Sequence, residues 1–183
     1  MERMNRSEWI EFVSGHLAMS SVGSSTLRSQ VNAGGAEAAR NFLKNGISLT
    51  NLENINERDF SKFLNKKTQA LSKYLLRPDN GQPNFGAARK VINIFLRHCA
   101  MNKDLHREFK LDTVEQFFEV PLDSYVVAGI DANNGSNFSR GFTIRNLTPK
   151  LNSDIQSAAM EIARRRKLHR YELDVLFWGC DIQ

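Results

Sequence analysis

Two segments, NFGAARKVINIFLRHC (Asn84–Cys99) and EVPLDSYV (Glu119–Val126), decide how this chain is expected to fold. The first overlaps RPDNGQPNFG (Arg77–Gly86), the densest turn signal in the sequence, whose prolines, glycines and asparagines cannot continue a helix. The helix that resumes after this turn carries Lys90 just inside its start. In the second segment, Asp123 follows a proline and a leucine at the beginning of another helix. A lysine and a carboxylate at two adjoining helix starts can converge on one ligand.

Helices are expected on both sides of the turn. Upstream, residues 58–76 repeat apolar side chains at helical spacing, and these side chains are Phe60, Phe63, Leu64, Leu71, Leu75 and Leu76. Downstream, one helix face is apolar and contains Ala88, Val91, Ile92, Phe95 and Cys99. The opposite face contains Lys90, Asn93 and Arg97. The pattern predicts a helix, a tight hairpin and a second helix over residues 58–99.

The rest of the chain also favours helices. A first helix is predicted over residues 6–20, with Trp9, Ile10, Val13 and Leu17 toward a core. Another helix is predicted at residues 36–46, and two more are predicted to start at Asp112 and at Asp123. One long last helix, bent or straight, is predicted from Asn152 or Ser153 to Trp178. The loop at residues 131–141 is expected to be the most mobile. The prediction is an all-α fold forming a single domain over residues 1–183, as one body or as two closely packed lobes.

Composition narrows the class of protein. The chain has 183 residues and a net charge of +5, which favours a polyanionic partner. Basic residues gather at 62–77, at 89–97 and in RRRKLHR (Arg164–Arg170), although each run could equally be a solvated helix face. There is no apolar run long enough to span a membrane. Two cysteines, Cys99 and Cys180, fit a reduced intracellular protein, and no Cys/His spacing suggests a metal site.

The chemistry of Lys90 and Asp123 has two interpretations at this level. A lysine near the positive end of a helix dipole, if partly desolvated, has a lowered pKa, and its neutral amine can act as a nucleophile. Most helical lysines, however, simply face solvent. Asp123 is equally suited to capping its helix, although a capping carboxylate can still direct its second oxygen into a cleft. Gly86 could let backbone N–H groups approach a phosphate, or it could simply permit the turn.

Two motifs carry a resemblance to a known family. Gly-x-x-x-Lys-Val-x-x-Ile (Gly86–Ile94) and Val-Pro-Leu-Asp-Ser-Tyr-Val (Val120–Val126) resemble the two signatures of the helix-hairpin-helix DNA glycosylase superfamily. In that family a lysine begins the second hairpin helix and an aspartate follows in a sequence like Val-Asp-Thr-His-Val. The present chain departs by having two extra residues between the glycine and Lys90, and QPNFG in place of Leu-Pro-Gly-Val-Gly.

The spacing of the two motifs is similar to the archaeal 8-oxoguanine glycosylase branch of that family. Lys90 and Asp123 are 123 − 90 = 33 positions apart, longer than in endonuclease III-like enzymes. Asp174 and Trp178 lie four positions apart, on one face of a helix, as the base-holding Asp and Trp of that branch do. The resemblance implies base contacts by Gln30, Pro121, Asp174 and Trp178, and DNA contacts by Gly86, Arg89 and Arg97.

The resemblance implies an enzyme that extrudes a base from DNA and excises it. Trp178 would stack on the base, and Asp174 would accept hydrogen bonds from a guanine-like N1–H and 2-amino group. Asp123 would stabilise the positive charge on the sugar, and Lys90 would attack C1′. The expected function is a DNA glycosylase and abasic-site lyase acting on 8-oxoguanine or a related base. A non-catalytic helix-hairpin-helix protein that binds DNA or a modified nucleotide is the alternative, and it would need neither Lys90 nor Asp123.

The same resemblance sets the remaining expectations. The partner is double-stranded DNA that contains a modified base, without a cofactor and without a membrane. The protein is expected to be a monomer in the cytoplasm, where it meets DNA. A role in defence against modified phage DNA finds no support in the sequence.

Overall fold

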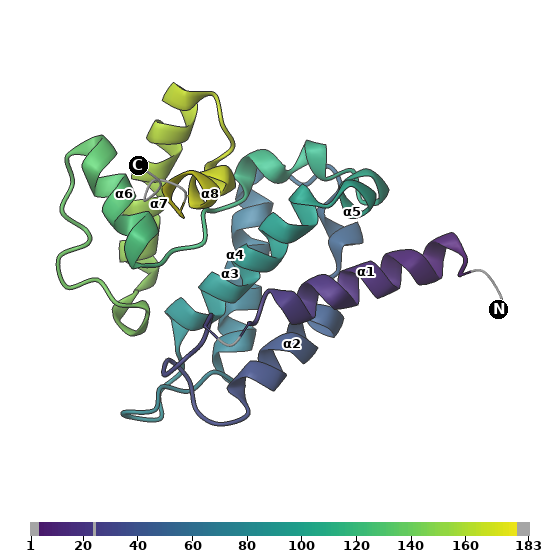
Figure 1. The fold of residues 1–183 in the computed structure, drawn as a ribbon, viewed down its shortest axis with the longest axis horizontal. Helices are drawn as coiled ribbons and strands as arrows, with labels where there is room; N and C mark the ends of the chain where they lie inside the picture. Colours follow the sequence, from purple (N-terminus) through teal and green to yellow (C-terminus); the bar gives the residue numbers. More distant parts are fainter. Residues whose placement is uncertain (1–3, 24, 179–183) are drawn as a thin grey trace.

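The structure is a computed structural model that describes residues 4–23 and 25–178. Within these ranges all regular elements are helices, and a single antiparallel bridge between Leu76 and Pro83 closes the hairpin (Figure 1). The predicted all-α class is confirmed. The predicted reduced state of Cys180 lies outside the described residues, whereas Cys99 is a buried free thiol.

The helices follow one another through short connections. The α-helices are α1 (Arg6–Ser20), α2 (Gly35–Gly46), α3 (Glu57–Ser72), α4 (Phe85–Met101), α5 (Lys103–Glu108), α6 (Ser124–Asn134), α7 (Pro149–Arg166) and α8 (Leu173–Trp178). The 3₁₀ turns are η1 (Leu49–Leu52), η2 (Leu111–Thr113), η3 (Glu115–Phe117), η4 (Ile144–Asn146) and η5 (Arg170–Glu172).

Helix α4 is the central element of the first lobe, which contains α1 to α5. Its predicted apolar face, Ala88, Val91, Ile92, Phe95 and Cys99, is fully buried. Helix α3 lies beside it, and the hairpin between them is closed by the Arg77 N–H donating to the Gln82 carbonyl at 2.8 Å. Helix α3 ends at Ser72, four residues earlier than predicted, because the chain from there to Leu76 already turns into the hairpin. Two helices joined by a turn with one antiparallel bridge are thus present in this part of the chain.

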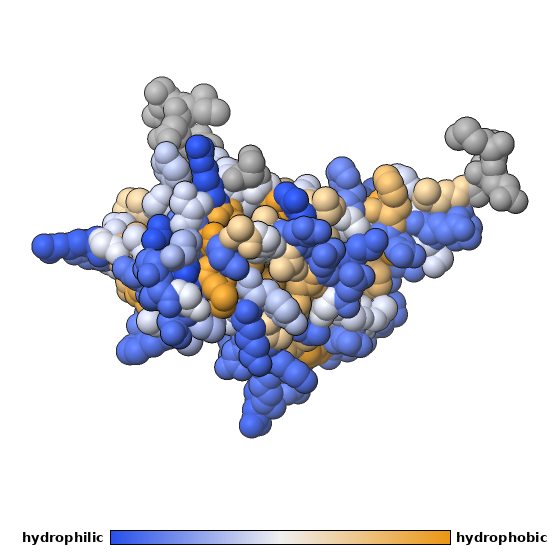
Figure 2. All heavy atoms as spheres, turned by 90° about the horizontal axis from the view of Figure 1, so that it is seen from below, coloured by the Kyte–Doolittle hydropathy of each residue, from blue (hydrophilic) through white to orange (hydrophobic). Residues whose placement is uncertain are grey.

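Helices α6, α7 and α8 form a second lobe beside the first (Figure 1). Its core is a separate cluster in which Val126 and Ile130 of α6 lie with Ile155 and Ile162 of α7 and with Phe177 of α8. The described residues therefore form two separate buried apolar clusters. On the face of the molecule seen in Figure 2, hydrophilic residues dominate, and hydrophobic residues show between them in a few places.

The predicted long C-terminal helix is divided in two. Helix α7 begins earlier than predicted, at Pro149 with Thr148 as its cap. It ends at Arg166 and is followed by the capping residue Lys167, which adopts a left-handed conformation with φ 57°. The chain then turns through η5 and starts α8. This break lets Leu173 and Phe177 pack into the second lobe, a tertiary requirement that helical spacing alone does not reveal.

Gly86 shows how closely the lobes approach. It is the second residue of α4 and is buried against η4. A Cβ atom built at Gly86 would lie 2.0 Å from the carbonyl oxygen of Ile144 and 3.0 Å from Cβ of Leu147. Backbone cannot move aside as a flexible side chain can, so the position accepts only glycine.

Replacing Gly86 with alanine should therefore destabilise the protein. Overpacking of this kind typically costs about 1–3 kcal/mol and sometimes more, and thermal unfolding followed by circular dichroism would measure it. Gly15→Ala on α1 is the matched control, because a Cβ there would meet only the Lys44 side chain at 3.7 Å. Alanine is favoured over glycine inside helices by about 0.5–1 kcal/mol, so this variant should be at least as stable as the wild type. An unchanged midpoint for Gly86→Ala would contradict the observed packing.

Candidate active site

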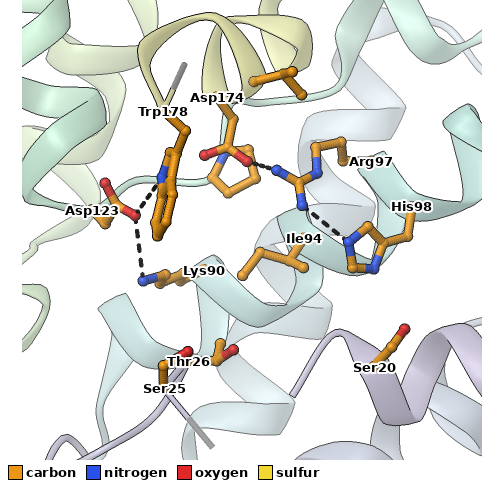
Figure 3. A pocket seen from close by; sticks show the side chains of 12 residues that line it. Ser20, Ser25, Thr26, Lys90, Ile94, Arg97, His98, Asp123, Asp174 and Trp178 are labelled. Atoms are coloured by element: carbon orange, nitrogen blue, oxygen red, sulfur yellow. Dashed lines mark hydrogen bonds and ion pairs between the residues drawn. The ribbon is translucent and has the colours of Figure 1, made fainter. Parts of the chain in front are cut away.

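A pocket of about 490 Å³ opens between the two lobes (Figure 3). Its walls come from the end of α1, the loop that follows, one face of α4, the segment before α6, and α8. The lining residues are Ser20, Ser25, Thr26, Lys90, Ile94, Arg97, His98, Pro121, Asp123, Asp174, Val175 and Trp178. The fold thus brings into one pocket six of the nine residues singled out in the sequence, although they lie as far apart as Lys90 and Trp178.

Asp123 has two roles in this pocket, one for each carboxylate oxygen. Oδ1 accepts a hydrogen bond from the Val126 N–H at 3.0 Å and so caps α6. Oδ2 accepts from Nε1 of Trp178 at 3.2 Å and lies 3.9 Å from Nζ of Lys90. The side chains of Lys90 and Asp123 are only 14% and 16% exposed. The capping and the pocket-facing interpretations of Asp123 therefore both apply.

Burial changes the acid–base behaviour of Lys90. Desolvation lowers the pKa of its ammonium group, and the nearby negative charge of Asp123 raises it, with desolvation the stronger influence. The net pKa is below the ordinary value for lysine. A larger fraction of the amine is therefore neutral than at a surface lysine, as a nucleophile requires.

A second polar group lies at the other side of the pocket. Arg97 forms an ion pair with Oδ2 of Asp174, and its Nη2 donates to Nε2 of His98 at 3.0 Å. Because arginine has no acceptor, His98 Nε2 must accept, which leaves the ring proton on Nδ1. Nδ1 lies 2.9 Å from Oγ of Ser21, whose own proton goes to the Leu17 carbonyl at 2.7 Å.

The protonation state of His98 agrees with this hydrogen-bond direction. Burial, together with the positive charge of Arg97, lowers the pKa of His98 to about 4. The imidazole is therefore neutral near pH 7. It holds Arg97 in place as an acceptor and adds no charge to the pocket.

Apolar surfaces complete the pocket. Trp178 is 61% exposed at the opening, and its ring lies between Asp123 and Asp174 (Figure 3). Ile94 and Pro121 also line the pocket, and the ring of Tyr125 lies 5.7 Å from that of Trp178. An exposed indole with carboxylates on both sides can stack on a planar polar ligand while fixing its edge.

Gln30 does not lie where the resemblance implied. It is outside the pocket and beside the hairpin, where Nδ2 of Asn84 donates to its backbone carbonyl at 2.9 Å. The residues of this loop that do reach the pocket are Ser25 and Thr26. The expected base contact by Gln30 is not supported, because the turn that follows Thr26 directs the chain away from Lys90.

Two of the three expected DNA-contacting residues face the interior. Gly86 packs against the backbone of η4. Arg89 is only 6% exposed, and its guanidinium lies 3.1 Å from Oε2 of Glu119 and donates to Thr68 and Asn65 of α3. Arg97 belongs to the pocket. The structure supports no phosphate contact by Gly86 or Arg89, because these positions of α4 are turned toward other helices.

The basic run at 164–170 is partly structural. Arg165 and Arg166 donate to the backbone and side-chain oxygens of Asn133 at the end of α6. Arg170 donates to the carbonyls of Phe117 and Phe118 between the lobes. These groups satisfy carbonyl oxygens of the protein itself, so charge in this run is weak support for a nucleic-acid surface.

The sequence interpretation missed several pocket residues. Ile94 and His98 follow Lys90 by four and eight positions, so they lie on the same face of α4 as Lys90 and Arg97, and helical spacing could have identified them. Ser20, Ser25 and Thr26 carry no comparable signal. Their position depends on how the loop after α1 folds over α4.

Neither a metal site, nor a membrane span, nor a related protein helps to define the function of this pocket. Among residues 4–23 and 25–178, no group of three or more His, Cys, Asp or Glu side chains is placed to hold a metal ion. No helix in the same ranges has the length and apolar character needed to cross a membrane. Comparisons with known protein families, with curated proteins and with solved structures found no match.

Proposed function

We propose that this protein is a DNA glycosylase with abasic-site lyase activity that removes 8-oxoguanine or a related modified base. The observation that carries the proposal is the pair formed by Lys90 and Asp123. A buried amine of lowered pKa lies 3.9 Å from a carboxylate oxygen, in a pocket whose opening is flanked by Trp178. An amine, an anion and a stacking surface are the groups that base excision by a lysine nucleophile needs.

The pocket is suited to a base rotated out of the duplex. Extrusion exposes the base and its sugar carbon to groups that cannot reach them inside the stack. Trp178 would stack on the face of the base, and Asp174 would meet its polar edge. For a base held in this way, C1′ of the sugar would have to reach Lys90 and Asp123, which line the same pocket as Asp174 and Trp178.

The chemical steps then follow from the two residues. As the bond between C1′ and the base breaks, positive charge develops on the sugar, and the fixed carboxylate of Asp123 stabilises it. The lone pair of Lys90 forms a bond to C1′ as the bond from C1′ to the base breaks, and the departing base takes up a proton from water. The Lys90 nitrogen loses a proton to solvent, and its lone pair then opens the bond between C1′ and the ring oxygen, which takes up a proton, to give a protonated Schiff base. Water removes a proton from C2′, and the electrons of that C–H bond expel the 3′ phosphate and cut the strand.

An incision assay tests this proposal against the non-catalytic alternative. Duplexes that each contain one modified base, with 8-oxoguanine among them, are incubated with the protein and treated with or without hot alkali. A glycosylase with lyase activity should cut at one of the modified bases without alkali. Retention of the same duplexes in a binding assay, with no incision and no alkali-labile site, would instead indicate a binding protein.

Removing the Trp178 ring should weaken activity through lost stacking. Base–aromatic stacking is worth roughly 1–3 kcal/mol per base, so Trp178→Ala should lower kcat/KM by about 5- to 150-fold. Trp178→Phe keeps an aromatic face and loses the hydrogen bond to Asp123, and it should retain more activity. Trp9→Ala is the control, because Trp9 lies on α1 and donates to Asp104 away from the pocket. Wild-type kcat/KM for Trp178→Ala would show that α8 does not contact the base.

A further inference from the structure

Arg97 has more hydrogen-bond donors than its protein partners use. Its guanidinium carries five N–H groups. One nitrogen, Nη1, is paired with Asp174, and Nη2 donates to His98. Nε is buried and has no hydrogen-bond partner among the described residues, so it does not face the pocket. Nη1 and Nη2 each carry a second N–H group, and Arg97 lines the pocket. These second N–H groups are the donors that a ligand could use.

Hydrogen bonds to residues outside the Asp174 pair hold the Arg97 side chain in position. The Leu17 carbonyl, Ser21 and His98 form a chain of hydrogen bonds that ends on Nη2. His98 can act as this acceptor only while it is neutral, and its lowered pKa keeps it so. A donor anchored in this way loses little freedom when it binds a ligand, which favours a role in recognition.

Asp174 supplies the complementary groups. Its Oδ2 is paired with Arg97, and a carboxylate can accept about four hydrogen bonds in all. The side chain is 8% exposed and lines the pocket. The same patch of the pocket thus contains N–H donors and carboxylate acceptors side by side.

We infer that Arg97 is the residue that selects the base, by donating to a carbonyl oxygen at its C6 position. Asp174 accepts from the neighbouring N1–H and 2-amino groups. The inference rests on the proposed function, since it requires a base in this pocket, and it adds the residue that distinguishes an oxygen from an amino group at C6. A 6-aminopurine would present an N–H group to the N–H groups of Arg97, leaving buried donors unpaired. Arg97 thereby takes the polar contact that the sequence resemblance had assigned to Gln30.

Three nucleosides that share an 8-oxo group isolate the two contacts. They are 8-oxo-2′-deoxyguanosine, 8-oxo-2′-deoxyinosine, which lacks the 2-amino group, and 8-oxo-2′-deoxyadenosine, which lacks the 2-amino group and N1–H and has a 6-amino group in place of the carbonyl. Quenching of Trp178 fluorescence measures their dissociation constants without any need for catalysis. Because an unpaired buried polar group costs about 1–3 kcal/mol, the mismatch at C6 alone should make the wild type bind the guanine nucleoside about 5- to 150-fold more tightly than the adenine nucleoside. The Asp174 contacts add to this preference.

Variants then assign the preference to residues. Arg97→Met should lower the preference for the guanine over the adenine nucleoside by about 5- to 150-fold, the share that the C6 contact supplies, and should leave the share that Asp174 supplies through N1–H and the 2-amino group. Arg97→Lys keeps a donor and should keep most of the C6 share. Asp174→Asn should mainly remove the preference for the guanine over the inosine nucleoside. A guanine-over-adenine preference that is as large in Arg97→Met as in the wild type would overturn the inference, and so would a wild type that binds none of the three or all three equally.

Two controls keep the outcome decisive. Circular dichroism reports whether Arg97→Met still folds, since this variant leaves Asp174 without its partner. If Arg97→Met does not fold, the nucleoside preference of the wild type and that of Arg97→Lys decide whether the inference holds. Incision of duplexes with the same three bases separates the inference from the proposed function. A preference among the nucleosides without incision of any duplex supports the role of Arg97 in base selection and contradicts the proposed glycosylase activity. Incision at 8-oxoadenine that is as fast as at 8-oxoguanine contradicts the role of Arg97 in base selection and supports the proposed glycosylase activity.

Discussion

Asp123→Asn should slow base release by roughly 10²- to 10³-fold, the usual effect of removing one preorganised electrostatic group from an active site. The substitution keeps the shape of the side chain and removes its charge. Nδ2 of the new amide would face the Trp178 Nε1–H and the Lys90 amine, where Oδ2 of Asp123 now lies. Single-turnover measurement of base release from a lesion-containing duplex would test this, because it isolates the chemical step from product release.

The loss would not reflect unfolding or a missing nucleophile. Asn caps helices nearly as well as Asp, so the bond to the Val126 N–H should persist. The charge of Asp123 raises the pKa of Lys90, so removing it lowers that pKa further and leaves the amine more often neutral. Reduced base release with a competent amine would therefore point to lost stabilisation of the sugar cation.

A matched substitution provides the control. Asp154→Asn on α7 removes the same charge from an exposed pair with Lys150, and such pairs contribute about 0.3–0.5 kcal/mol to stability. Its rate of base release should equal that of the wild type. If Asp123→Asn also released base at the wild-type rate, the carboxylate would have only its capping role.

The elements that could be predicted from sequence are those with local causes. The turn at residues 77–86 follows from its prolines and glycines, and the buried face of α4 follows from apolar spacing. Asp123 could be placed at a helix start for the same reason, since a capping side chain bonds within its own turn. The pairing of Lys90 with Asp123 followed from family resemblance, and the structure places the two side chains together.

The elements that could not be predicted depend on packing between distant segments. Arg89 has the sequence context of a surface cation, but α3 and Glu119 cover it. Gln30 is removed from the pocket by a turn. Lys167 ends α7 in a left-handed conformation without the glycine that usually signals such an end. For Arg89 the deciding contacts are made by residues remote in sequence, and at Gln30 and Lys167 the backbone turns where residue type and spacing give no signal.

The reaction should also depend on pH in a defined direction. In the proposed reaction only the neutral form of Lys90 attacks C1′, and burial lowers the pKa of Lys90 from the ordinary value of 10.5. The rate of Schiff base formation should therefore rise with pH and level off once the pH exceeds this lowered pKa. In Asp123→Asn the midpoint should move to lower pH, because the negative charge that raises the pKa is gone. A rate that falls as pH rises through this window would contradict a lysine nucleophile.

Lys90→Gln should abolish the covalent intermediate while leaving duplex binding close to that of the wild type. Glutamine retains most of the reach of lysine and cannot form a bond to C1′. Lys62→Gln is the control, because it removes the same charge from an exposed lysine on α3 that pairs with Asp59. It should form the intermediate as the wild type does.

Borohydride trapping is the most direct test of the central claim that Lys90 is the nucleophile. The wild type is incubated with sodium borohydride and a duplex that contains the modified base that the protein removes. It should give a stable protein–DNA adduct, and mass spectrometry of the adduct's peptides should place the sugar on Lys90. Lys90→Gln should give none. An adduct that persists in Lys90→Gln, or a wild-type protein that forms no adduct on any modified duplex, would contradict the account.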